Sequence, residues 1–251
     1  MQIKKYCGAW LAAAAATLIL ATPAQAAPVP GQGTWQTTLQ ARDLDGNGVT
    51  DAFYDTTLNI TWLRDANMNG PGTRDWYSAV AWVNGFSIGI YDDWRLPTMV
   101  DTGASGCDRS EAGGTDCGVN VQTTSGSTVY SEMASLWYDA LGNKTYWAPG
   151  TGIAPQAGSG LTNTGDFLNM QSYFYWSGLR YSPNSNKMAW FFEFGSGYQD
   201  AHTQRGQNYG IAVRPGDVVG AQVPEPETLV LALTALAGLG LVRRRRQARA
   251  R

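Results

Sequence analysis

Oxygen-bearing side chains recur at every second residue from Asp43 through Asp45 to Asn47, and another follows at Asp51. This spacing matches the first half of an EF-hand-type calcium loop, in which oxygens at loop positions 1, 3, 5, 7 and 9 surround the ion. Positions 1, 3, 5 and 9 are then Asp43, Asp45, Asn47 and Asp51, and position 7 supplies the backbone carbonyl of Val49. These residues predict calcium as a cofactor.

The loop is incomplete beside a full EF-hand. Position 12 is Tyr54 in place of the usual bidentate glutamate, and no amphipathic helices flank the loop. Any calcium affinity is therefore expected to be weak, near about 10⁻⁴ M as in extracellular modules. The alternative is a polar turn, because Asp, Asn and Gly are also the preferred turn residues. A second match at 65–70 carries less acid and is interpreted as such a turn.

No catalytic residue is predicted. Residues 85–89 spell the G-x-S-x-G pattern of a nucleophile elbow, but that elbow needs a strand before it and a helix after it. The preceding segment reads as a helix, and the only histidine, His202, lies in a polar stretch interpreted as a surface loop. A two-carboxylate glycosidase stays open as an alternative, although no spacing favours a particular acidic pair.

Two cysteines remain once Cys7, in the N-terminal segment, is set aside: Cys107 and Cys117. In an exported protein they predict one disulfide that closes a small Gly- and Asp-rich loop. A metal-binding or redox pair is not favoured, because the spacing is not Cys-x-x-Cys and no histidine lies near.

Aromatic side chains in loops are candidates for stacking on sugar rings, because such rings offer apolar faces. Most tryptophans fall inside expected helices and strands and are interpreted as core. The candidates in Gly-, Asn- and Pro-rich loops are Trp147, Tyr181 and Tyr198. The alternative for each is a framework role.

Two helices are expected to position these residues. The first follows Asp75 as N-cap, places apolar side chains at helical spacing as far as Val83, and stops at Gly85. The second covers 131–141, with Ser131 as cap and with a core face of Met133, Leu136 and Trp137.

Strands are expected at 58–63 and, toward the end of the chain, at 173–177, 188–194 and 209–214, separated by Gly-, Ser- and Asn-rich turns. Helices early and an antiparallel sheet late indicate the α+β class.

The N-terminus has the features of a secretory signal peptide at 1–26. Lys4 and Lys5 precede an apolar stretch, and Ala24-Gln25-Ala26 offers small residues for cleavage. A flexible Pro- and Gly-rich leader is expected at 27–42. The Sec export machinery is the implied partner of this end.

The C-terminal segment 218–251 joins a linker, an apolar run expected to be a transmembrane helix at 228–242, and an arginine-rich tail at 243–251. Its 15 apolar residues give roughly 22 Å of helix, against a hydrocarbon core of about 30 Å. The run is preceded by Val223, Pro224, Glu225 and Pro226. Together these features resemble the PEP-CTERM protein-sorting signal of Gram-negative bacteria. The resemblance implies recognition of Pro-Glu-Pro and nearby cleavage by an exosortase, after transient association with the inner membrane.

The formal net charge of −2 conceals an asymmetry. Two of the 18 basic residues lie in the signal peptide and six follow Val242, whereas all 20 acidic residues lie between. The exported portion therefore has ten basic and 20 acidic residues, a net charge of −10. This excess of acid argues against nucleic acid as a partner.

Residues 43–217 resemble the Lcl C-terminal domain family, long known only as a domain of unknown function. The most specific piece is Asp93-Trp94-Arg95-Leu96-Pro97-Thr98, accompanied by Ile60–Leu63, Tyr175-Trp176-Ser177, Ala189-Trp190 and Ala212–Pro215. The resemblance implies a single C-type-lectin-like domain and binding to a glycan or matrix. Within the motif, Arg95 is expected to be partly buried, stacked on an aromatic ring and paired with Asp92 or Asp93.

These observations predict an exported cell-surface or matrix protein that is processed by exosortase. Its expected role is a non-catalytic binding or structural component associated with exopolysaccharide, for example in a biofilm. The alternative is a secreted polysaccharide-modifying hydrolase.

Overall fold

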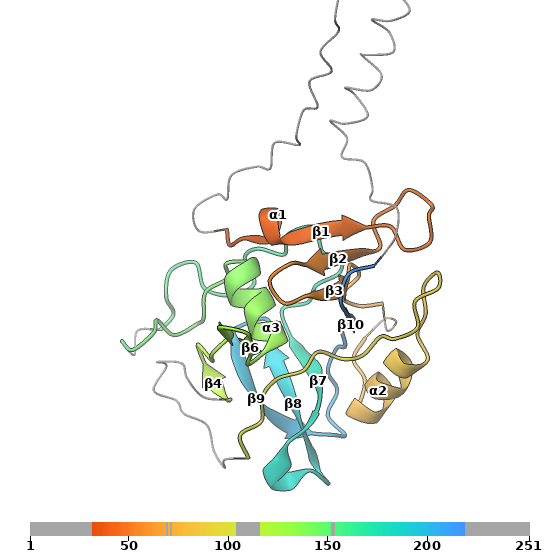
Figure 1. Cartoon of the computed structure of the whole chain (residues 1–251). Helices are drawn as coiled ribbons and strands as arrows, with labels where there is room; N and C mark the ends of the chain where they lie inside the picture. Colours follow the sequence, from red (N-terminus) through yellow and green to blue (C-terminus); the bar gives the residue numbers. More distant parts are fainter. Residues whose placement is uncertain (1–31, 69, 71, 104–115, 152–153, 219–251) are drawn as a thin grey trace, which may run out of the picture.

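Antiparallel strands dominate the computed structural model, which describes residues 32–68, 70, 72–103, 116–151 and 154–218 (Figure 1). The first sheet has the order β1-β2-β3-β10, formed by Leu39–Arg42, Ala52–Asp55, Ile60–Leu63 and Val213–Pro215. The second has the order β4-β9-β8-β7, formed by Gly118–Val119, Tyr198–Thr203, Met188–Glu193 and Phe174–Arg180. A hairpin pairs β5 (Thr124–Ser125) with β6 (Thr128–Val129).

The helices are few and short among the described residues. They are α1 (Trp35–Thr38), α2 (Trp76–Asn84), α3 (Glu132–Ala134) with the π-helical η1 (Ser135–Ala140), and the 3₁₀ turn η2 (Ser182–Asn184). Sheets with short helices are consistent with an α+β or a mainly β fold. No helix in the described ranges has the length and apolar character that crossing a membrane requires. The expected signal helix and the apolar run at 228–242 lie outside these ranges.

Helix α2 forms for the reasons that the sequence predicts. The Asp75 carboxylate accepts a hydrogen bond from the Ser78 amide (2.8 Å), and so satisfies an amide that the first turn leaves unpaired. Trp76, Ala79 and Val83 lie on one face and are buried.

The second expected helix is also present, as α3 followed by η1. The Ser131 hydroxyl accepts from the Ala134 amide, and the predicted core residues Met133, Leu136 and Trp137 are buried. Gly142 follows at φ +67°, a backbone conformation that favours glycine.

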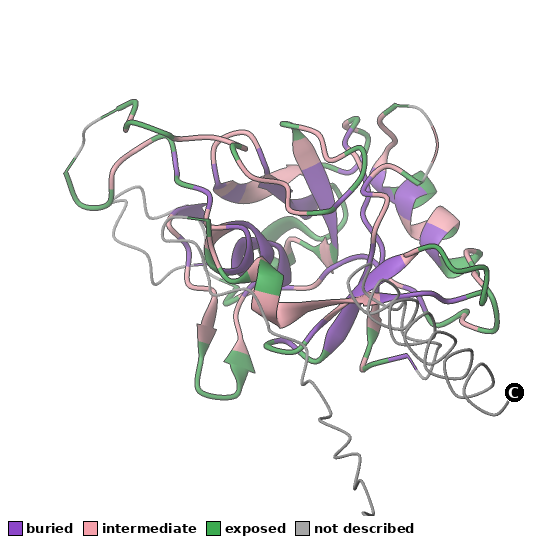
Figure 2. Ribbon diagram, turned by 90° about the horizontal axis from the view of Figure 1, so that it is seen from above, coloured by how far each residue is buried: buried purple, intermediate pink, exposed green. Residues whose placement is uncertain are grey.

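The second sheet carries a core on each face, because alternate side chains of a strand point to opposite sides. On one face, Tyr175 and Phe192 pack with Trp137 of η1; on the other, Trp176 and Phe191 pack in a cluster with α2. In Figure 1 the first sheet lies above the second. Figure 2 shows that most exposed stretches belong to loops and hairpin tips.

The observed elements differ from the expectations in several places, and strands β2, β4, β5 and β6 were not expected at all. The leader expected at 27–42 contains α1 and β1, and the Thr34 amide donates to the Ala140 carbonyl (2.8 Å). Strand β9 was missed because its polar residues give no apolar alternation. The strand expected at 209–214 is shorter, since only Val213–Pro215 pairs with β3.

Candidate functional site

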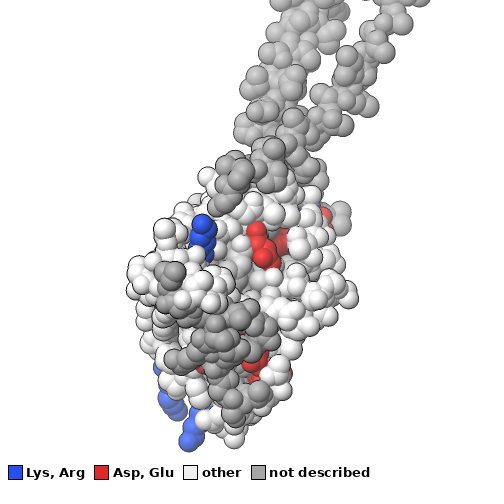
Figure 3. Space-filling view, turned by 90° about the vertical axis from the view of Figure 1, so that its left-hand side faces the viewer, with Lys and Arg blue, Asp and Glu red and all other residues white. Residues whose placement is uncertain are grey.

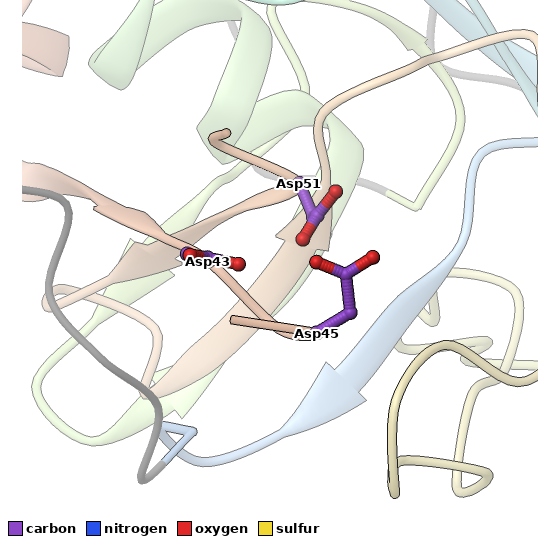
Figure 4. A group of neighbouring side chains, drawn as sticks. All are labelled: Asp43, Asp45 and Asp51. Carbon is purple, nitrogen blue, oxygen red and sulfur yellow. The ribbon is translucent and has the colours of Figure 1, made fainter. Parts of the chain in front are cut away.

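The predicted calcium ligands form a loop between β1 and β2 (Figure 4). The amide of Asp51 donates to the Arg42 carbonyl (2.8 Å), which closes the loop at its base. Carboxylate oxygens of Asp43, Asp45 and Asp51 lie within 4.8 Å of one another. Asp43 is buried, Asp51 half-buried and Asp45 exposed. This arrangement of oxygen donors matches what a hard cation such as calcium prefers.

Loop amides hold Asp43 in place. Its carboxylate accepts from Gly48 (2.7 Å), Gly46 (2.8 Å) and Asn47 (3.2 Å). The Gly48 amide is the main reason that the pKa of Asp43 is lowered. The φ angles of Gly46 (+79°) and Gly48 (+85°) place both in the left-handed region, which explains why the loop uses glycine there.

Asp51 behaves in the opposite way. Burial, followed by the negative charges of Asp45 and Asp43, raises the pKa of its carboxyl group. Asp43 and Asp45 therefore repel the Asp51 carboxylate, and a bound cation would relieve that repulsion.

The two remaining predicted ligands lie on the same loop. The side-chain oxygen of Asn47 accepts from the Val49 amide (2.7 Å), and its nitrogen donates to Asp45 (3.0 Å). Val49 is exposed. Such bonds are those of an Asx turn, so the turn interpretation and the calcium interpretation describe the same backbone.

The second match behaves as a turn. The Asp65 carboxylate accepts from the Asn67 amide (2.9 Å) and from the Asn169 side chain (3.0 Å). Asp65 does not belong to a group of acidic, histidine or cysteine side chains close enough to hold a metal ion. Among the described residues, such a group is found only in the Asp43 loop.

The predicted sugar-stacking residues lie in three different settings. Trp147 is half-buried beside Tyr146, with ring centroids 4.8 Å apart. Tyr181 packs edge-on against Trp190 at 5.0 Å. Tyr198, expected in a loop, begins β9 and contacts Phe191 at 6.5 Å.

Tyr198 belongs to a row of aromatic rings that sequence reasoning missed. The row runs from Tyr173 to Phe174 (4.9 Å, stacked), from Phe174 to Phe191 (4.7 Å) and on to Tyr198. We call these four residues the aromatic row. Tyr173 is 44% exposed, Phe174 and Tyr198 are half-buried, and Phe191 is buried (6% exposed) in the cluster that contains α2 residues. The period-2 pattern of β7 and β8 could have indicated it, but β9 had not been recognised.

Two carboxylates border the aromatic row. The Tyr198 hydroxyl donates to Asp200 (2.7 Å), and the Ser196 hydroxyl donates to Glu193 (2.6 Å). In the β8–β9 ladder Glu193 lies opposite Tyr198 and Phe191 lies opposite Asp200, so all four point to one side of the sheet. Phe191, Tyr198 and the two carboxylates therefore share one face of the second sheet.

The expected partner of Arg95 in the 93–98 motif was wrong. Arg95 forms a two-pronged ion pair with Glu132 (2.7 and 2.8 Å) and not with Asp92 or Asp93. Asp93 pairs with Arg214 (2.7 Å), whose guanidinium lies over the Tyr91 ring. The remaining members of the motif include the buried Trp94, Leu96 and Pro97.

The interpretation of His202 as a loop residue was also wrong. His202 lies in β9 and stacks on Trp176, with ring centroids 5.8 Å apart at 22°. Helix α2 precedes Ser87, so the strand–turn–helix geometry of a nucleophile elbow is not present.

Cys117 is buried and disulfide-bonded. Its expected partner, Cys107, lies outside the described residues, so the pairing itself stays a prediction. The sorting residues Val223 to Pro226 also lie outside.

Comparison with known proteins identifies one segment of the chain. Residues 222–246 match the model of the PEP-CTERM protein-sorting motif. Neither a curated protein nor a solved structure matches the chain. The motif implies recognition by exosortase and export toward the cell envelope or surface of a Gram-negative bacterium. The chain thus carries the sorting motif of an exported surface protein that exosortase processes.

Proposed function

We propose that the folded domain is a non-catalytic component of the extracellular matrix that binds exopolysaccharide through the aromatic row. The aromatic row is the observation that supports this proposal most directly. Pyranose rings have apolar C–H faces that stack on aromatic side chains, and carboxylates accept hydrogen bonds from sugar hydroxyls. Both kinds of group lie along β7–β9, where Phe174 and Tyr198 are half-buried and Phe191 beneath them is buried.

The charge of the exported portion makes a strongly acidic polymer a poor partner. Its net charge is −10, and Glu193 and Asp200 lie beside the aromatic row. On the face that Figure 3 draws, charged side chains are few, and the basic ones do not form a continuous surface. A neutral or amine-bearing sugar polymer fits these charges better than a uronic acid polymer does.

We propose in addition that the domain has a C-type-lectin-like architecture and that the Asp43 loop binds calcium weakly. The carboxylates of the loop support the second proposal, because three of them converge within 4.8 Å. Calcium would stabilise the loop, and with it the start of β2.

The experiment for polysaccharide binding compares the full chain with Tyr173→Ala, using exopolysaccharide purified from the producing strain. Tyr173 is exposed, so its loss is expected to weaken binding several-fold without unfolding the domain. The matched control is Tyr77→Ala on α2, a tyrosine of similar exposure (48% against 44%).

Two outcomes would contradict the proposal. Equal binding by the parent and by Tyr173→Ala would remove the aromatic row from the interaction. Release of reducing ends during incubation, abolished by Glu193→Gln or Asp200→Asn, would instead favour the hydrolase alternative.

A further inference from the structure

The last described residues, Arg214–Val218, are fastened to the domain, and we call them the exit strap. The Gly216 amide donates to the Asn59 carbonyl (2.9 Å), and the Gly216 carbonyl accepts from the Thr61 hydroxyl (2.7 Å). Val218 is 4% exposed and packs in the cluster that contains Leu44. The chain is therefore held on the domain as far as Val218.

Two ion pairs hold the exit strap: Arg214 at its start pairs with Asp93 (2.7 Å), and Asp217 pairs with Arg42 across the first sheet. The Arg42 guanidinium donates to both carboxylate oxygens of Asp217 (2.7 and 2.8 Å). Arg42 is buried, lies over the Tyr54 ring at 5.4 Å and also donates to the Gln40 side chain (2.9 Å). A two-pronged pair of this kind fixes orientation as well as contributing energy.

The sorting motif begins close to this fastening. Four residues, 219–222, separate Val218 from Val223 along the chain, so five Cα–Cα steps join them. A fully extended chain spans at most about 3.3–3.6 Å per residue, so the motif can start no further than roughly 18 Å from the anchored Val218. An enzyme that engages Pro224–Pro226 must therefore work close to the folded domain.

We propose that Arg42 and Asp217 are positioning residues for the processing of the sorting motif. By holding the exit strap on the first sheet, the pair fixes the length of chain between the folded domain and the exosortase. Loss of the pair leaves Gly216–Val218 held by the Gly216 hydrogen bonds to Asn59 and Thr61 and by the packing of Val218. Detachment of these three residues would lengthen the accessible chain by about 10 Å. Neither residue touches the processed bond; both act through the position of the chain.

The test measures the processed fraction of the protein in a host that carries the exosortase. It compares the parent, a deletion of 219–221, Asp217→Ala and the combination of the two changes. Deletion of 219–221 shortens the chain by about 10 Å and is expected to lower the processed fraction several-fold. Asp217→Ala alone is expected to leave processing unchanged, and in the deletion background it is expected to restore most of the processed fraction. Asp217 is the better site for substitution, because its side chain is 43% exposed and that of Arg42 only 4%.

A matched control separates positioning from general destabilisation. Glu132→Gln breaks the Arg95–Glu132 pair, an ion pair of equal length that does not hold the exit strap. Rescue of the deletion by Glu132→Gln would overturn the proposal, as would full processing of the deletion variant with the exit strap intact. Failure of Asp217→Ala to rescue the deletion, with the domain still folded by circular dichroism, would overturn it too. None of these outcomes depends on polysaccharide binding.

Discussion

Asp45 is the member of the Asp43 loop that tests calcium binding most directly. It is exposed, so Asp45→Asn changes the charge of the loop while its backbone contacts stay available. If the dissociation constant is about 10⁻⁴ M, calcium at a hundred times that concentration stabilises the parent by roughly 2.7 kcal/mol. The melting temperature of the parent is therefore expected to rise by several degrees in calcium relative to chelator, and that of Asp45→Asn by much less.

The control for this measurement is Asp92→Asn, at an exposed carboxylate outside the loop, which should keep the full response to calcium. A melting temperature of the parent that is the same in calcium and in chelator would leave only the polar-turn interpretation.

Asp217 predicts a pH dependence that can be measured independently of processing. The hydrogen bond from Arg42 is the main cause that lowers the pKa of Asp217 below its ordinary value of 3.8. A carboxyl whose pKa is lower in the folded state stabilises the fold above about pH 3.8, and loses that contribution as the pH falls through the folded-state pKa. Because the side chain is 43% exposed, we expect a contribution of less than about 1 kcal/mol.

Urea unfolding of the parent and Asp217→Asn between pH 2 and 6 measures this contribution. The stability difference between them should be largest near pH 6 and should shrink toward pH 2. A difference that is constant over the whole range would mean that Asp217 contributes by packing alone.

At the scale of elements, the clearest prediction concerns the N-terminus of α2, where Asp75 is the N-cap. Asp75→Ala removes the acceptor of the Ser78 amide and is expected to cost about 1 kcal/mol in the free energy of unfolding. Asp75→Asn keeps a side-chain oxygen and should cost less. Equal losses in urea unfolding of the two variants would show that the charge, and not the N-cap hydrogen bond, stabilises the helix.

Local patterns predicted some elements well and left others out for physical reasons. The caps at Asp75 and Ser131 depend on neighbours within three residues, so the sequence alone contains them. The pairing of Arg95 with Glu132, 37 residues away, depends on the fold, and local reasoning named the nearer Asp92 or Asp93. The candidate sites differ in the same way. The calcium loop is one continuous segment, so the sequence alone could predict it. The aromatic row joins three strands, so it depends on the fold.

At the scale of the whole molecule, the exit strap joins the folded domain to the sorting motif, so the position of the first sheet limits where the motif can begin. Strand β10, the last strand in the chain, lies at the edge of the first sheet and pairs with β3. The matched sorting motif begins at residue 222, shortly after β10 ends at Pro215. Folding of the first sheet therefore requires the chain as far as β10, and only the residues after Val218 remain for processing.

The final prediction concerns the mature protein. Because the six trailing arginines lie C-terminal to Pro224–Pro226, cleavage near Glu225 removes all of them and leaves a strongly acidic product. Mass spectrometry of the secreted form should then give a C-terminus near Glu225, and the product should bind an anion exchanger at neutral pH. Replacing Pro224 and Pro226 by alanine is expected to leave a protein that keeps its C-terminal segment, because the substitution removes the Pro-Glu-Pro that exosortase is expected to recognise. A secreted species of unchanged mass from that variant would mean that processing does not require Pro-Glu-Pro.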